Sequence, residues 1–188
     1  MAYAGHSLGA VTAFRAAFKT PELFSKIIAI DPAILPHRLA RFYPLVKHMR
    51  LLAKRNRLYA GALKRRKDWA DRAEALAYFT GRKALATWPE QAVEGYVDSA
   101  LVPGAAGLTL SCDRIWESRT FKHVPAEIGF RLKHLQVPTL LIRASRGSIY
   151  PDHLTLSAQI TERRMEGSHF VHLETPDLVA EEIHAFLV

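Results

Sequence analysis

A five-residue stretch near the start of the chain, Gly5-His6-Ser7-Leu8-Gly9, limits most strongly what this sequence can fold into. It has the form G-x-S-x-G, in which a sharp turn from a strand into a helix exposes the serine hydroxyl and strains its backbone. We expect only small residues to fit at positions 5 and 9, because strand and helix pass close together there. Residues 1–4 can end a strand, and residues 10–18 are an apolar run typical of a helix. The stretch therefore predicts an exposed, fixed nucleophile at Ser7.

A short apolar run at residues 26–30 is followed directly by Asp31 and Pro32. Its length and its β-branched residues predict a buried parallel strand. Functional side chains in open α/β sheets gather at the carboxyl ends of such strands, so Asp31 is a candidate functional carboxylate. An Asp-Pro pair is also a common turn signal, and that interpretation stays open.

The remaining pattern divides the chain into three segments. After Pro36 it favours helices, and strand character returns near Val137. The predicted helices are residues 38–67, 68–82, 89–101, 113–122 (capped by Asp113), one or two turns within 152–158, and a capped helix at 175–187; the predicted extended pieces are 108–110, 137–143 and 160–165. We therefore predict an α/β core of residues 1–35 and 131–188 with an inserted helical cap over residues 36–130.

Composition limits the class of protein. With 188 residues, 49% of them hydrophobic, the chain can bury a core of its own. No apolar run approaches the ~20 residues of a membrane span. Cys112 is the single cysteine, which excludes an internal disulfide framework and favours a reducing compartment, so we expect a cytoplasmic location. The sequence has no metal-ligand spacing, and we expect neither a metal nor another cofactor.

The basic charge is concentrated in one segment. Between His37 and Arg72 there are twelve Lys or Arg residues against two Asp, a net charge of +10, whereas the whole chain carries +8. An anionic partner such as a membrane surface, nucleic acid or acidic substrate is one interpretation. The other is a solvated helical face, because leucines and valines recur in the segment at roughly helical spacing. We expect no specific nucleic-acid binding, and at most weak contact of this basic cap with an anionic membrane surface.

Four stretches together resemble the α/β-hydrolase fold family, in its serine esterase or lipase-like, capped bacterial form. Gly5-His-Ser-Leu-Gly9 resembles the family's elbow, and Ser, acid, His is the family's chain order. Ile28-Ala-Ile-Asp-Pro32 is similar to the end of the family's sixth strand, and Val137-Pro-Thr-Leu-Leu-Ile142 is similar to its seventh strand. The last match is Gly167-Ser-His169 with Leu173-Glu-Thr-Pro176, which is similar to the family's terminal G-x-H and L-E-x-P. The resemblance runs from Met1 to Val188 and implies a parallel sheet with an inserted cap.

The resemblance also implies the site residues. Ser7 would be the nucleophile, His169 the base, and the backbone N–H of Leu8 one donor to the oxyanion. His172 is the alternative base, and His6 is expected to be a partly buried histidine of the pocket wall. Most family members carry the triad acid after the seventh strand, where this chain has Ser148, which cannot replace a carboxylate.

The acid must therefore come from elsewhere. Some family members carry it after the sixth strand, where this chain has Asp31, so Asp31 is the expected acid, and Asp152 is the alternative. The resemblance begins at the family's fifth strand, so the first four strands and the loop with the second oxyanion donor have no counterpart here. We expect a fragment whose elbow strand forms an exposed sheet edge.

The sequence thus predicts a serine hydrolase acting on a small-molecule carboxylic ester or related acyl substrate through an acyl-enzyme. Thioester, lactone and carbon-carbon bond hydrolysis use the same triad and stay open, as does the oligomeric state. The alternative hypothesis is a non-catalytic binding module, or truncated relic of a hydrolase, that keeps the pocket without the chemistry.

Overall fold

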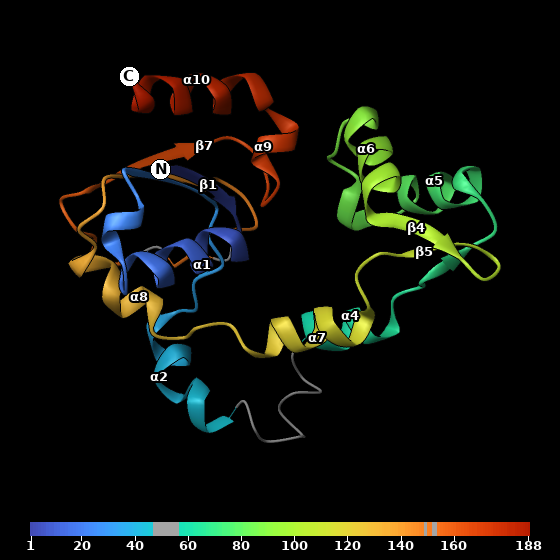
Figure 1. Ribbon diagram of the computed structural model, residues 1–188, viewed down its shortest axis with the longest axis horizontal. Coiled ribbons are helices and arrows are strands. Elements are labelled where there is room, and N and C mark those ends of the chain that lie inside the picture. The colour runs from blue at the N-terminus through green and yellow to red at the C-terminus, as the bar shows by residue number, and fades with distance from the viewer. Residues whose placement is uncertain (47–56, 149, 152–153) are drawn as a thin grey trace. The chain divides into compact units, whose positions relative to one another are not determined.

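The computed structural model describes the chain except for residues 47–56, 149 and 152–153 (Figure 1). Its residues form two compact units. The first, here called the core unit, comprises residues 1–44 and 125–188, and the second unit comprises residues 45–124. The predicted assignment of residues 36–130 to a cap stays a prediction.

The core unit is built on a parallel sheet of four strands. In spatial order these are β1 (Ala2–His6), β2 (Lys26–Ile30), β6 (Thr139–Ala144) and β7 (Ile160–Met165). All neighbouring pairs are parallel. The four predicted strands are confirmed, and β1 lies at one edge of the described sheet, as expected. All four carboxyl ends consequently lie at the same side of the sheet.

Helices cover both faces of this sheet (Figure 1). On one face lie α1 (Leu8–Ala17), α8 (Ile128–Arg131) and the 3₁₀ turn η3 (Leu132–His134); on the other lie α9 (Val171–Glu174) and α10 (Pro176–Leu187). Strand β2 contributes side chains to the packing on both faces of the sheet, because successive side chains point in opposite directions. Ile27 and Ala29 pack into the core under α1, whereas Ile28 and Ile30 pack against α9 and α10. This two-sided burial explains why the strand is apolar throughout.

Two local predictions for the core unit need correction. Residues 154–158 are not helical, while residues 152 and 153 of the predicted turns lie outside the described part of the chain. Thr175 precedes α10 as expected, but its hydroxyl donates to the carbonyl of Val171 and caps no N–H of that helix. The remaining elements here are η1 (Pro21–Leu23) and α2 (His37–Val46), which starts in the core unit.

The second unit contains a small antiparallel sheet that the sequence analysis did not predict. Its strands, in the order β3-β5-β4, are β3 (Asp68–Trp69), β5 (Gly107–Leu110) and β4 (Leu101–Gly104). The helices are α4 (Arg57–Lys64), α5 (Arg72–Thr80), η2 (Lys83–Leu85), α6 (Glu90–Ala100) and α7 (Arg114–Lys122). Trp69 is buried and packs on Phe79, with ring centroids 5.2 Å apart. Asp113 caps α7 as predicted, accepting from the N–H of Ile115.

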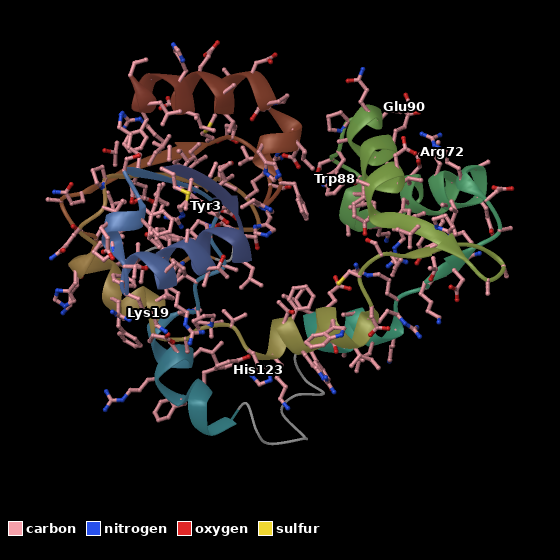
Figure 2. All side chains as sticks on the ribbon, in the orientation of Figure 1. Tyr3, Lys19, Arg72, Trp88, Glu90 and His123 are labelled. Carbon is pink, nitrogen blue, oxygen red and sulfur yellow. The ribbon has the colours of Figure 1, made fainter. Side chains whose placement is uncertain are left out.

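Several cations of the basic segment form ion pairs within the second unit. Arg72 on α5, labelled in Figure 2, donates through two nitrogens to the carboxylate of Asp98. Arg65 pairs with Glu117, and Arg66 pairs with Glu74. These contacts neutralise part of the charge that the sequence places between His37 and Arg72.

None of the helices in the described ranges is both long enough and apolar enough to cross a membrane.

The two glycines of the elbow differ in the space around them. A Cβ atom added at Gly5 would lie 2.7 Å from the backbone carbon of Gly9 and 2.8 Å from the backbone nitrogen of Ala10. At Gly9 the nearest atom would be the hydroxyl oxygen of Tyr3, at an ordinary 3.9 Å. Tyr3, labelled in Figure 2, is on β1 with its ring edge-on to Phe24. The expectation of a size limit is therefore confirmed at position 5 and wrong at position 9.

This difference predicts opposite effects of alanine on stability. Gly5→Ala should lower the free energy of unfolding by about 3 kcal/mol or more, the upper range for overpacking, because backbone atoms cannot move aside cheaply. Gly9→Ala should leave it unchanged or raise it by about 0.5–1 kcal/mol, because alanine favours the helix. Urea unfolding followed by far-ultraviolet circular dichroism measures both, and equal losses in the two variants would contradict the prediction.

Candidate active site

Ser7 occupies a strained turn between β1 and α1. Its backbone angles are φ 52° and ψ −114°, outside the regions that L-residues ordinarily adopt. The N–H of Ser7 donates to the carbonyl of Ile30 at 2.9 Å, which continues the ladder between β1 and β2 by one residue. Such strain persists only where surrounding structure enforces it, and here the strand ladder and the helix start do so. The hydroxyl is consequently held at the carboxyl end of the sheet.

Three predicted residues from distant parts of the chain meet at this point. The Nε2 atom of His169 lies 3.0 Å from Oγ of Ser7. The Nδ1 atom of the same ring lies 2.6 Å from Oδ2 of Asp31. The imidazole therefore bridges the hydroxyl and the carboxylate, and both distances are those of hydrogen bonds.

Asp31 is fully buried, at 0% exposure, directly after β2. Its φ of 38° is also in the left-handed region. Its Oδ1 accepts from the N–H of Ala144 at 3.0 Å and from the hydroxyl of Ser148 at 2.6 Å. Burial by itself would raise the pKa of this carboxyl, but the hydrogen bonds from His169, Ser148 and Ala144 outweigh it and lower the pKa below its ordinary value. Asp31 is thus held as a carboxylate facing His169.

The loop that carries His169 is fixed by a carboxylate on the helix after it. Glu174 of α9 accepts hydrogen bonds from the N–H and the hydroxyl of Ser168. Gly167 has a φ of 147°, and a side chain there would meet this carboxylate and Val171. Hydrogen bonds between Ser168 and Glu174 therefore join the G-x-H and L-E-x-P stretches.

Two further imidazoles lie beside His169. The centroid of the His6 ring is 4.6 Å from that of His169 and 4.3 Å from that of His172. Nε2 of His6 lies 2.7 Å from the backbone oxygen of His169. Burial lowers the pKa of His6 to about 4, the neighbouring His172 and His169 rings add to this, and the bond to the carbonyl opposes it. Burial and His169 likewise lower the pKa of His172, whose Nδ1 has no hydrogen-bond partner among the described residues.

The other predicted site residues are Leu8 and Asp152. Leu8 is the first residue of α1, so its N–H has no partner inside the helix and lies at the positive end of the helix dipole. Asp152, the alternative acid, lies outside the described residues. No cluster of three or more His, Cys, Asp or Glu side chains that could hold a metal ion occurs in the part of the chain that the structure describes.

The comparison with protein families matches residues 3–182 to the model of the alpha/beta hydrolase family. The chain belongs to the α/β-hydrolase family. The match covers both units, and the parallel sheet with helices on its two faces is the corresponding fold. The comparison with curated proteins gave no match.

Solved structures with the α/β-hydrolase fold align with nearly all of the chain. The crystal structure of E-2-(acetamidomethylene)succinate hydrolase has a TM-score of 0.72 and 21% identity, covering 99% of this chain and 66% of that one. The thioesterase domain from the curacin biosynthetic pathway has a TM-score of 0.68 and 18% identity, covering 98% and 65%. An M. tuberculosis esterase has a TM-score of 0.68 and 18% identity, covering 99% and 62%. At these identities the likeness concerns the fold, and the chain spans about two thirds of the length of these structures.

Sequence reasoning missed three contributors to the site. It excluded Ser148 as an acid, yet the Ser148 hydroxyl donates to Asp31 from the loop after the seventh strand of the family pattern. It used Glu174 only as part of a matched stretch, although the carboxylate binds the histidine loop. It treated His6 as a wall residue. Glu174 is only five residues from His169, so its closeness to the histidine loop was visible in the sequence. No local pattern predicts the hydrogen bonds of Ser148 and His6, because each joins residues more than 100 positions apart.

Proposed function

We propose that the chain is a serine hydrolase that cleaves a carboxylic ester or a related acyl substrate through an acyl-enzyme on Ser7. The observation that carries this proposal is the unbroken series of hydrogen bonds from Ser7 through His169 to Asp31, with distances of 3.0 and 2.6 Å. An unassisted serine hydroxyl is a weak nucleophile and needs a base in hydrogen-bond reach. The base in turn needs a group that fixes its tautomer, and buried Asp31 fits that role.

In the first half of the proposed reaction, Nε2 of His169 accepts the hydroxyl proton while Oγ of Ser7 attacks the acyl carbon. Nδ1–H stays bonded to Asp31, whose negative charge stabilises the imidazolium. His169 then passes the proton to the departing alcohol or thiol, which leaves an acyl group on Ser7. In the second half, water loses a proton to His169 and attacks the acyl carbon. The bond between that carbon and Oγ of Ser7 then breaks, the carboxylic acid leaves, and the imidazolium returns the proton to Oγ.

The N–H of Leu8 is the proposed donor to the oxyanion. It directly follows the nucleophile at the start of α1, where the helix dipole favours negative charge. One such donor typically supplies about 3 kcal/mol of transition-state stabilisation.

The compared structures also support an acyl substrate. Their descriptions are those of a hydrolase, a thioesterase domain and an esterase. Esters and thioesters both place a carbonyl carbon in front of the nucleophile, so the proposal includes both. No metal or other cofactor takes part in these steps.

A fluorophosphonate probe tests the proposal, because it phosphonylates a serine only where a base activates the hydroxyl. We expect the folded chain to gain one adduct, located on the peptide that contains Ser7 by mass spectrometry. The Ser7→Ala variant, which should fold normally, is the matched control and should gain none. Absence of labelling in folded, unmodified chain would favour the non-catalytic binding module instead.

A further inference from the structure

We propose that His6 is a positioning residue for the base: its side chain holds the main chain of His169 in register with the nucleophile. The inference rests on the proposed roles of Ser7 and His169. It assigns a task to the residue between the elbow glycine and the serine, which the reaction itself does not use.

The first support is the hydrogen bond between the two segments. His6 ends β1, in register with Ile30 of β2, and is therefore fixed by the sheet. Its Nε2 lies 2.7 Å from the carbonyl oxygen of His169, 163 residues away in sequence. In the described part of the chain, this bond joins β1, which leads into Ser7, directly to the main chain of His169.

The carbonyl of His169 is free for this contact because α9 begins beyond it. The N–H of Val171 bonds to the carbonyl of Ser168, and the N–H groups of Leu173 and Glu174 bond to the carbonyl of Phe170. None of these three bonds at the start of α9 uses the carbonyl of His169. A side chain from β1 accordingly satisfies an acceptor that the helix leaves unused.

The second support is the protonation of the His6 ring: the contact requires a proton on Nε2, and burial favours the neutral ring. A carbonyl oxygen only accepts, so Nε2 of His6 must carry the proton, and the neutral ring then has a bare Nδ1. Burial keeps the ring neutral by lowering the pKa of His6 to about 4, with His172 and His169 adding to the effect. A cationic ring 4.6 Å from His169 would oppose the imidazolium formed during acyl transfer, whereas the neutral ring does not.

The third support is the packing of the rings. His6 lies against His169 at a tilt of 47° and against Phe170 with centroids 5.5 Å apart. The ring of His6 thus packs against the ring of His169, and the Nε2–H group of His6 binds the backbone carbonyl of His169. A displacement of about 1 Å at a reacting group can cost about 10²-fold in rate, so a loss of this support should appear in turnover.

Two substitutions of similar size separate the hydrogen bond from the packing. His6→Gln keeps an N–H donor near the position of Nε2, whereas His6→Met has the same reach without a donor. We expect His6→Met to lower the rate of fluorophosphonate labelling of Ser7 and the kcat for p-nitrophenyl butyrate by about 10- to 100-fold, with KM nearly unchanged. His6→Gln should restore most of the rate. A role in packing alone would lower both variants alike.

Nuclear magnetic resonance of the ¹⁵N-labelled, unmodified chain gives a readout independent of activity. We expect His6 as the neutral Nε2–H tautomer at pH 6, and urea unfolding of both variants checks that they are folded. The inference is overturned if His6→Met labels as fast as the unmodified chain, or if the proton of His6 is on Nδ1. If the unmodified chain does not label at all, the proposed function fails, and the tautomer still decides whether His6 makes its bond.

Discussion

His169→Ala should reduce hydrolysis of p-nitrophenyl butyrate by a factor on the order of 10⁶, to the level of Ser7→Ala. The reason is that Nε2 of His169 is 3.0 Å from Oγ of Ser7 and is the proposed acceptor of its proton in both halves of the reaction. Alanine removes the acceptor while the hydroxyl stays in place. Steady-state rates of purified, folded variants, with Ser7→Ala as the blank, provide the measurement.

His172→Ala is the matched control, because the sequence left His172 open as the base. Its Nδ1 has no hydrogen-bond partner among the described residues, and its ring contacts His6. We expect a loss that is small beside that of His169→Ala. The double variant Ser7→Ala, His169→Ala should be no worse than either single variant, since the two residues act as one unit. If His172→Ala lost more hydrolytic activity than His169→Ala, the role of base would belong to His172.

Asp31→Asn should lower turnover by about 10⁴-fold, the loss expected when a triad loses its carboxylate. The asparagine oxygen can still accept from Ala144 and Ser148, as Oδ1 of Asp31 does now. Its amide group would then face Nδ1 of His169 with N–H donors, so Nδ1 would have to accept. The proton of the neutral ring would move to Nε2, where it blocks acceptance of the Ser7 proton.

The control for this variant is Asp152→Asn, since Asp152 was the alternative acid. We expect Asp152→Asn to have little effect on kcat, because buried Asp31 already occupies Nδ1 of His169 at 2.6 Å. The pKa of Asp31 is below its ordinary value, so the side chain should stay ionised into acidic solution and become protonated only as pH falls through the lowered pKa. A mild Asp31→Asn together with a severe Asp152→Asn would reverse the assignment.

The core unit was predictable where a local pattern has one structural meaning. The apolar, β-branched runs at 26–30 and 137–143 are typical of buried parallel strands, and the structure has strands at Lys26–Ile30 and Thr139–Ala144. The antiparallel sheet of the second unit was not predictable in this way. Its strand β3 has two residues, Asp68 and Trp69, and pairs with β5 across about 40 positions of sequence. A strand so short has no periodicity to detect.

By itself, the sequence determined the residue types of the site and their order along the chain. Ser7 in its glycine turn, Asp31 after a buried strand and His169 after the last strand follow from local patterns and a family resemblance, because strand ends and tight turns are encoded by neighbouring residues. Only the tertiary structure decided the contacts: Nε2 of His169 at Ser7, Ser148 on Asp31, and His6 on the carbonyl of His169. These bonds join segments more than 100 residues apart. Their distances depend on the register of four parallel strands, which no short stretch of sequence specifies.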